Sequence, residues 1–314
     1  MNTAILEKKA SSEMLADVLQ GLKKPQKTVP SKYFYDKRGS ELFEQICKLD
    51  EYYPTRTELS IMSENVEEIA ELLGPNTQLV ELGSGSSLKT RLLLDNLTDI
   101  DSYLPVDIST EFLADVTNEL QSEYPSLNIL PVAADYTQSF SLPETAFDSR
   151  RIAYYPGSTI GNFTKERAAA FLSLIAGLLG EKGGLLIGFD LLKEKEILIE
   201  TYDDTEGVTA EFNKNILLRM NRDLNANFNP DAFCHKAIFN EDESRIEMHL
   251  VSQRDQVVDI MGTVVAFSKG ESIHTENSHK YSLESFRDIT APHFEPVKTW
   301  MDKNELFAVQ FLTK

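Results

Sequence analysis

The stretch Gln78-Leu79-Val80-Glu81-Leu82-Gly83-Ser84-Gly85 decides the fold of this chain. Its first five residues are a short, mainly apolar run typical of a buried strand, and a helical pattern follows over residues 88–97. The glycines between them allow the backbone to turn tightly and to approach a ligand closely. The stretch therefore predicts a strand, a ligand-facing turn and a helix.

Downstream of this stretch, strand and helix patterns keep alternating. The expected strands cover residues 103–106, 127–132, 151–155 and 184–189, and the expected helices cover residues 111–120 and 165–179. This alternation is typical of a parallel sheet whose strands are joined by right-handed helical crossovers. We therefore predict an α/β protein.

The segment from about residue 194 to residue 280 breaks the alternation and predicts a separate α+β insertion. It contains a helical pattern over 208–224 and alternating runs over 244–252, 257–267 and 272–281. Outside the insertion, helices are expected at 11–23, 58–73 and 283–289, and strand-like runs at 296–301 and 306–312.

Charge and composition exclude several classes of protein. Among 314 residues there are 31 lysines and arginines against 50 aspartates and glutamates, a formal net charge of −19. Such an acidic surface repels phosphate backbones and anionic lipids, so neither nucleic acid nor a membrane surface is an expected partner. Two cysteines, Cys47 and Cys234, cannot form a disulfide scaffold or a cysteine-rich zinc site. The five histidines form no His-x-x-x-His pair, so no metal is expected.

No signal peptide or membrane-length apolar run is visible, and the expected location is the cytoplasm. The sequence does not determine the oligomeric state, and a monomer is the favoured expectation.

The glycine turn favours S-adenosylmethionine over a dinucleotide. A dinucleotide fingerprint has a third glycine where this chain has Leu88. Instead an acid, Glu81, stands two residues before Gly83, and an acid suits the ammonium of the methionine moiety. NAD-linked oxidoreduction is therefore the weaker alternative.

Acids also follow the next two strands. Asp107 could accept hydrogen bonds from both ribose hydroxyls, Asp135 could accept from the adenine amino group, and Tyr136 could stack on the ring. One such acid is often a helix cap, but ligands of open α/β sheets bind at the carboxyl ends of the strands. The predicted cofactor site comprises Glu81, Gly83, Ser84, Gly85, Lys89, Asp107, Asp135 and Tyr136.

The loop over residues 155–163, after the fourth strand, is expected to face the substrate. Asn162 offers a donor and an acceptor, which suits an amino-acid head group. Alternatively, Asn162 caps the helix that follows.

A long series of motifs makes the chain similar to the L-histidine Nα-methyltransferases of ergothioneine biosynthesis. The resemblance runs from about Lys32 to the C-terminus, although fungal N-methyltransferases of tryptophan derivatives share many of the motifs. They are Lys32-Tyr33-Phe34-Tyr35-Asp36, Gly39-Ser40-Glu41-Leu42-Phe43, Glu51-Tyr52-Tyr53-Pro54-Thr55-Arg56-Thr57-Glu58, Glu81-Leu82-Gly83-Ser84-Gly85, Gly157-Ser158-Thr159-Ile160-Gly161-Asn162, Tyr202-Asp203-Asp204, Gly207-Val208-Thr209-Ala210, Asn221-Arg222-Asp223-Leu224, Arg245-Ile246-Glu247-Met248, and Thr275-Glu276 with Ser278 and Lys280.

The resemblance implies a Rossmann-like class I methyltransferase domain over residues 58–195 and 281–314. It also implies an α+β substrate-binding domain over 1–57 and 196–280. The implied reaction is trimethylation of the α-amino group of L-histidine to hercynine by three in-line transfers from S-adenosylmethionine, without a metal. The implied site residues are Tyr35 near the amine, acting through water, Asn162 and Tyr202 at the carboxylate, Tyr52 lining the pocket, Glu276 and Ser278 facing the imidazole, and Met248 packing on the ring.

The residues support a histidine substrate independently of the resemblance. In a strand, Glu276 and Ser278 share one face and could address the two ring nitrogens, whereas His249, Asn277 and His279 are expected on the opposite faces. Met248 could equally be plain core, and Glu276 an ordinary surface acid. The other readings are methylation of tryptophan or another aromatic amino acid, and a non-catalytic sensor of S-adenosylmethionine.

Overall fold

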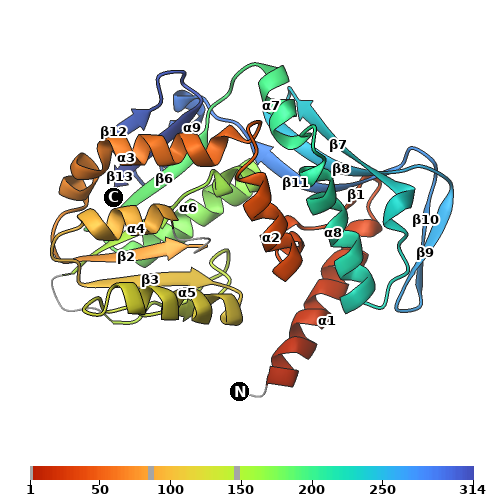
Figure 1. The fold of residues 1–314 in the computed structure, drawn as a ribbon, viewed down its shortest axis with the longest axis horizontal. Helices are drawn as coiled ribbons and strands as arrows, with labels where there is room; N and C mark the ends of the chain where they lie inside the picture. Colours follow the sequence, from red (N-terminus) through yellow and green to blue (C-terminus); the bar gives the residue numbers. More distant parts are fainter. Residues whose placement is uncertain (1–2, 84–87, 145–148) are drawn as a thin grey trace. The chain divides into compact units, whose positions relative to one another are not determined.

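The computed structural model describes residues 3–83, 88–144 and 149–314 (Figure 1). Its contacts divide the chain into two compact units. The first unit comprises residues 1–53 and 193–279, and the second comprises residues 54–192 and 280–314. The insertion in the middle of the sequence therefore folds together with the N-terminal segment.

The second unit is built on a seven-stranded sheet in the order β12-β13-β6-β5-β2-β3-β4. Strands β2 to β6 pair in parallel, whereas β13 pairs antiparallel with both β6 and β12. The strands are β2 (Thr77–Leu82), β3 (Ser102–Asp107), β4 (Val132–Ala133), β5 (Arg150–Tyr155), β6 (Gly184–Asp190), β12 (Glu295–Met301) and β13 (Phe307–Thr313). The predicted α/β class, with a sheet rich in parallel strands, is confirmed.

Helices cover both faces of this sheet (Figure 1). On one face, α3 (Tyr53–Leu73), α4 (Leu88–Asn96) and α5 (Thr110–Glu123) share a hydrophobic core with Leu79 of β2. On the other face, α6 (Lys165–Leu179) and α9 (Leu283–Thr290) share a second hydrophobic core with Val80. The whole of β2 is buried, and its neighbouring residues Leu79 and Val80 enter different cores because successive side chains of a strand point to opposite faces.

The first unit contains a four-stranded sheet in the order β1-β11-β8-β7 and a β9-β10 hairpin. The strands are β1 (Lys27–Thr28), β7 (Phe233–Asn240), β8 (Arg245–Ser252), β9 (Gln256–Ile260), β10 (Thr263–Phe267) and β11 (Ser272–His279). The helices are α1 (Thr3–Leu22), α2 (Lys37–Ile46), α7 (Lys195–Tyr202) and α8 (Val208–Asp223). Residues of α1 and α8 form one core with Met248 and Leu250 of β8.

Several predicted elements differ from the structure. The strand expected at 127–132 is reduced to β4, because Pro131 has no N–H to donate to a ladder. The run at 257–267 is a hairpin, not one strand: Met261 and Gly262 both have positive φ, as a two-residue hairpin turn requires. Helices α1 and α3 begin earlier than the predicted residues 11 and 58, and α2, α7 and β7 had not been predicted at all.

Among the described residues, no helix combines the length and the apolar character needed to cross a membrane.

Candidate functional site

In the second unit, the glycine turn lies against Tyr136. Gly83 has a φ of 79°, and a Cβ on it would lie 3.5 Å from the Tyr136 hydroxyl oxygen. The Gly83 N–H donates to the Val106 carbonyl at 2.9 Å, which ties the turn to the end of β3. The predicted residues Ser84 and Gly85 lie outside the described residues. A glycine is therefore needed at position 83, because a side chain there would be strained and would reach Tyr136.

Glu81 lies below this turn and is only 3% exposed. Its carboxylate accepts a hydrogen bond from the Thr90 hydroxyl at 2.7 Å and another from the Tyr103 hydroxyl. Burial raises the pKa of Glu81, and these two hydrogen bonds oppose the rise. The carboxylate is thus held by neighbouring side chains within the unit.

The two strand-end acids each close a local turn. Asp107 Oδ1 accepts from the Ser109 N–H at 2.8 Å, and Asp135 Oδ1 accepts from the Thr137 N–H at 2.9 Å. The Ala134 N–H donates to the Asp107 carbonyl at 3.0 Å, so the structure brings the ends of β3 and β4 together. Burial raises the pKa of the Asp107 carboxyl.

The Lys89 ammonium pairs with Glu58, an acid that the sequence analysis did not assign to the site. Glu58 is fully buried, and its carboxylate also accepts from the Gly157 N–H at 2.9 Å. A Cβ on Gly188 would lie 2.0 Å from Glu58 Oε1, so only glycine leaves room for this acid. A lone acid on a helix face that otherwise carries Ile61 and Met62 was the available signal.

Asn162 ends a short 3₁₀ helix, Thr159–Asn162, and its side chain is half-buried. The alternative that Asn162 caps the next helix is wrong, because Thr164 is the N-cap of α6 and accepts from the Arg167 N–H. The loop before Asn162 turns through positive φ at Gly157 and Ser158. The Ser158 hydroxyl accepts from the Asp190 N–H at 3.0 Å and so fixes the loop to the end of β6.

In the first unit, aromatic side chains from separate segments form a cluster. Tyr52 packs edge-on against Phe43 and Tyr202, with ring centroids 6.1 and 6.2 Å away, and Tyr35 packs edge-on against Phe43 at 5.7 Å. Burial raises the pKa of Tyr52 well above its usual value, with a further rise from Tyr202. Phe43 joins the other rings although the sequence analysis gave it no role.

Strand β11 brings Glu276 and Ser278 to one face of the sheet of the first unit. Glu276 stands opposite Met248 of β8, and Ser278 stands opposite Ile246. The hydroxyls of Ser278 and Tyr202 are 2.7 Å apart. Met248 is 1% exposed and belongs to the hydrophobic core. The first unit therefore brings five predicted site residues together. Tyr35, Tyr52 and Tyr202 belong to the aromatic cluster, and Glu276 and Ser278 stand on strand β11.

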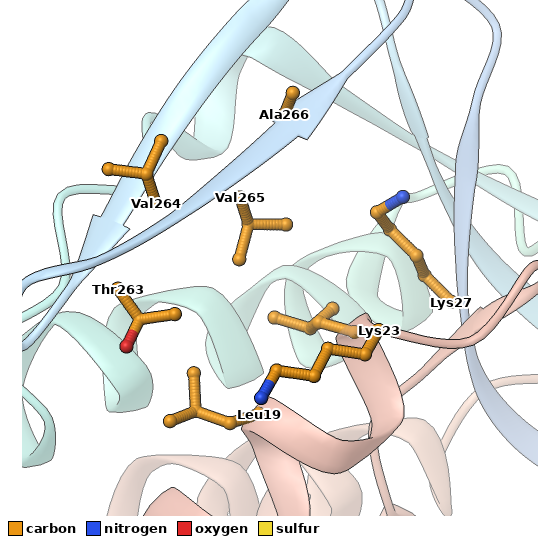
Figure 2. Close-up of a pocket in the computed structure, with 8 residues that line it drawn as sticks. Leu19, Lys23, Lys27, Thr263, Val264, Val265 and Ala266 are labelled. Atoms are coloured by element: carbon orange, nitrogen blue, oxygen red, sulfur yellow. The ribbon is translucent and has the colours of Figure 1, made fainter.

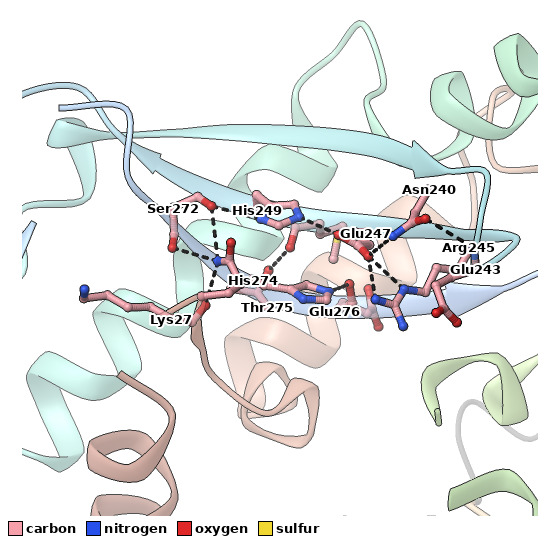
Figure 3. A network of polar contacts seen from close by, with 12 residues as sticks. Lys27, Asn240, Glu243, Arg245, Glu247, His249, Ser272, His274, Thr275 and Glu276 are labelled. Carbon is pink, nitrogen blue, oxygen red and sulfur yellow. Dashed lines mark hydrogen bonds and ion pairs between the residues drawn. The ribbon is translucent and has the colours of Figure 1, made fainter. Parts of the chain in front are cut away.

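The opposite face of the same sheet carries Glu247, His249 and His274, whose potential metal ligands lie within 4.8 Å of one another (Figure 3). Glu247 binds His249 Nε2 at 3.0 Å through Oε2, and its Oε1 accepts from Asn240 and from Arg245 at 2.8 Å. His274 Nε2 contacts the Glu276 carbonyl at 2.9 Å. A cation here would compete with the Arg245 guanidinium for the carboxylate.

A hollow of about 200 Å³ lies between the end of α1 and β10 (Figure 2). Its lining includes Leu19, Lys23, Lys27, Val264 and Val265, and it contains none of the predicted site residues. It therefore has no part in the candidate site.

Comparison with known families gives a match over most of the chain. A family model described as "Histidine-specific methyltransferase, SAM-dependent" matches residues 14–314.

Curated relatives match over similar lengths. A histidine N-alpha-methyltransferase of Mycobacterium tuberculosis is 40% identical over 304 residues, which cover 95% of this chain and 94% of the relative. A protein of the same name from Mycolicibacterium smegmatis is 42% identical, covering 88% of this chain and 87% of the relative. Ergothioneine biosynthesis protein 1 of Neurospora crassa is 30% identical, covering 91% of this chain but 33% of that protein.

Among solved structures, an S-adenosylmethionine-dependent methyltransferase from Clostridium acetobutylicum aligns with a TM-score of 0.50 at 10% identity, covering 88% of this chain and 97% of that one. This likeness concerns the fold, and it agrees with the class I methyltransferase sheet of the second unit.

Proposed function

Because the chain belongs to the family of histidine-specific, S-adenosylmethionine-dependent methyltransferases, we propose that it converts L-histidine to hercynine by trimethylating the α-amino group. The curated relatives named histidine N-alpha-methyltransferase and ergothioneine biosynthesis protein 1 support this substrate and a product that feeds ergothioneine biosynthesis. The observation that carries the proposal in the structure is the shared face of Glu276 and Ser278, with Ser278 bonded to Tyr202.

This polar pair suits an imidazole ring. Neutral imidazole has one N–H donor and one acceptor nitrogen, which a carboxylate and a hydroxyl can match. An indole offers a donor only and leaves one of the two partners unused. Since a site with unpaired buried polar groups rejects the analogue that cannot pair them, the pair favours histidine over tryptophan.

We assign cofactor binding to the second unit. Gly83 has no Cβ and leaves open the space beside Tyr136, which we assign to the adenine ring of S-adenosylmethionine. Asp107 lies at the end of the adjacent strand, and we assign it to the ribose. When bound, the sulfonium supplies an electrophilic methyl group. We also assign Glu81, Lys89 and Asp135 to the region of this turn. Glu81 is held there by its hydrogen bond from Thr90, and Lys89 by its ion pair with Glu58.

We assign the amino acid to the predicted residues of the first unit. Tyr202 binds the carboxylate, Tyr52 lines the pocket, and Met248 supports the ring from the core. Tyr35, which is 42% exposed, lies near the α-amine and relays the proton that leaves the substrate ammonium to water. A free lone pair is needed for each transfer, and an α-amine with a pKa of about 7.7–8 is mostly protonated at pH 7. None of the residues assigned to the amine is a strong base, so positioning the amine supplies most of the rate. The reaction stops after three transfers because the trimethylated nitrogen has no lone pair.

The test is mass spectrometry after incubating the purified chain with S-adenosylmethionine and an equimolar mixture of amino acids. Trimethylated histidine as the product supports the proposal. A trimethylated tryptophan would contradict the imidazole assignment and leave the cofactor assignment intact. Absence of any methylated amino acid, with cofactor binding verified by calorimetry, would refute the proposed reaction.

A further inference from the structure

Strand β11 contains a β-bulge just before the two residues proposed to read the imidazole. His274 stands opposite His249 and Glu276 stands opposite Met248, so Thr275 is an extra residue without an opposite partner. In an unbroken strand, Glu276 would point to the same face as His274, because residues two apart share a face. The bulge instead puts Glu276 on the Met248 face, while His274 stays on the face of His249.

The extra residue is pinned by a buried helix side chain. Thr275 is 2% exposed, and its hydroxyl donates to Asn213 Oδ1 at 2.7 Å. It also lies 3.0 Å from the Met248 carbonyl across the ladder. Asn213, on α8, is fully buried, and its Nδ2 donates to the His249 carbonyl at 3.2 Å. Both sides of the bulge are thus held by one amide group.

The same amide continues the hydrogen-bonded chain to Tyr202. Asn213 Nδ2 lies 2.8 Å from His235 Nδ1, and His235 Nε2 lies 2.8 Å from the Tyr202 carbonyl. Because a carbonyl can only accept, His235 carries its proton on Nε2, and its Nδ1 then accepts from Asn213. The tautomer of His235 and the orientation of the Asn213 amide therefore fix each other.

We infer that Asn213, Thr275 and His235 are positioning residues that set the substrate specificity of this chain. They hold the bulge that turns Glu276 and Ser278 to the substrate face, and they fix the backbone of Tyr202, whose hydroxyl lies 2.7 Å from Ser278 Oγ. The chain of bonds thereby couples the groups proposed for the imidazole to the group proposed for the carboxylate. This inference rests on the proposed function, since its substrate is L-histidine.

Asn213 is an unfavourable choice for the helix alone. Its neighbours Phe212, Ile216 and Leu217 are buried apolar residues of the same core, and asparagine has a low helix propensity. A buried amide is tolerated where all of its donors and acceptors are paired, and here the oxygen and both N–H groups have partners. This complete pairing of the Asn213 amide is what we expect of a side chain that holds the bulge at Thr275.

The test is Thr275→Val, which keeps the shape of the side chain and removes the hydroxyl. We expect KM for histidine to rise about tenfold or more, because Asn213 Oδ1 is left buried without a donor. A tenfold change corresponds to ~1.4 kcal/mol. The KM for S-adenosylmethionine should stay within about twofold of wild type, because none of these bonds lies in the second unit. Thr275→Ser restores the hydroxyl and should bring KM for histidine back toward wild type.

The matched control is Thr290→Val in α9, another buried threonine whose hydroxyl donates to a backbone carbonyl, that of Phe286. It should lower the melting temperature without changing KM for histidine. An unchanged KM in Thr275→Val, an equal rise in Thr290→Val, or a Thr275→Ser variant no better than Thr275→Val would overturn the inference.

A second pair of variants covers the case in which Thr275→Val does not fold. His235→Gln can still donate to the Tyr202 carbonyl, whereas His235→Phe cannot. We therefore expect His235→Phe to raise the KM for histidine more than His235→Gln does. Equal effects of the two variants would contradict the coupling through Tyr202. The wild-type chain is assayed first: failure to trimethylate histidine refutes the proposed function, whereas an active wild type with unresponsive variants refutes the positioning role alone.

Discussion

The hydroxyl of Tyr202 lies 2.7 Å from Oγ of Ser278, across 76 positions of sequence. Tyr202 is the last residue of α7, and Ser278 stands on β11, so a direct side-chain bond joins two distant segments of the first unit. In our proposal the two residues contact opposite ends of the same amino acid. Their bond therefore fixes the spacing between the site for the carboxylate and the site for the ring.

The bond predicts a measurable coupling between the two side chains. Tyr202→Phe and Ser278→Ala should each raise KM for histidine, and the double variant should lose less than the sum of the two. We expect a coupling free energy of about 0.5–1.5 kcal/mol, the usual contribution of one hydrogen bond. Strictly additive effects in the double-mutant cycle would show that the bond does not contribute to binding.

The Glu276 carboxylate should account for most of the selectivity for the ring. Glu276→Ala is expected to raise KM for histidine about 10- to 100-fold, since a hydrogen bond to a charged group contributes roughly 1.5–3 kcal/mol. Binding of S-adenosylmethionine, measured by calorimetry, should be unchanged. Glu276→Gln retains the size of the side chain and an acceptor oxygen, so its KM for histidine should fall between those of wild type and Glu276→Ala. Wild-type histidine turnover in Glu276→Ala would contradict the imidazole assignment.

The parts of the fold that the sequence predicted are those in which local pattern and tertiary burial agree. Strand β2 is buried along its whole length around the apolar residues Leu79, Val80 and Leu82, and α6 was predicted with its observed ends because Thr164 and Gly180 bracket an apolar helix. The strand expected at 127–132 was overestimated because Pro131 has no N–H to donate: Ile129 forms an isolated bridge with Tyr103, and the ladder with β3 resumes at β4.

Site features that depend on pairing between distant segments could not be predicted from the sequence. The sharing of one face by Glu276 and Ser278 follows from alternation alone, and the structure agrees. The bulge at Thr275 depends on register with β8, and the role of Asn213 depends on what α8 meets there. The partners of Glu58 could not be predicted either, because Lys89 and Gly157 come from other elements.

The strand-end acid Asp107 gives a prediction for the cofactor. Asp107→Ala should weaken S-adenosylmethionine binding about 10- to 100-fold, because a carboxylate that accepts ribose hydroxyls makes charge-assisted bonds of roughly 1.5–3 kcal/mol. The matched control is Asp101→Ala, which removes the acid that directly precedes β3, beyond the end opposite to Asp107. Calorimetric titration measures the dissociation constant of S-adenosylmethionine for both variants, and we expect that of Asp101→Ala to stay at the wild-type value. An unchanged dissociation constant for Asp107→Ala would exclude the ribose role.

The ion pair between Lys280 and Asp190 should dominate the stability of the second unit at the junction of β6 with the C-terminal segment. Both side chains are fully buried, with Nζ and Oδ2 2.6 Å apart. Lys280→Met removes the ammonium that faces the buried Asp190 charge, and we expect a loss of about 3–5 kcal/mol in the free energy of unfolding.

The exposed pair between Lys298 and Glu68 provides the contrast for this measurement. Both of its side chains are more than two-fifths exposed. Lys298→Ala should change the free energy of unfolding by no more than about 1 kcal/mol. Chemical denaturation of the two variants compares them directly. Equal losses would mean that burial does not set the importance of the Lys280 pair.

The histidines on the far face of the first-unit sheet predict how stability varies with pH. Burial lowers the pKa values of His249 and His274, and charge repulsion from the neighbouring His249 ring lowers the pKa of His274 further. Glu247 acts in the opposite direction on both rings, whereas Arg245 and, at His249, Lys236 lower the pKa further. The net direction is downward, so both rings are neutral in the folded chain near pH 7.

The sign of the pH effect follows from this direction. The unfolded chain has histidine pKa values near 6.5 and binds protons there before the folded chain does. The free energy of unfolding should therefore be greatest above about pH 7.5 and fall as the pH is lowered through 6.5, levelling off below the folded pKa values. Denaturation between about pH 5 and pH 8 measures this slope. His274→Gln, which can still donate to the Glu276 carbonyl, removes one titrating group and should flatten the slope; a slope equal to that of wild type would show that His274 does not titrate differently in the folded and unfolded chains.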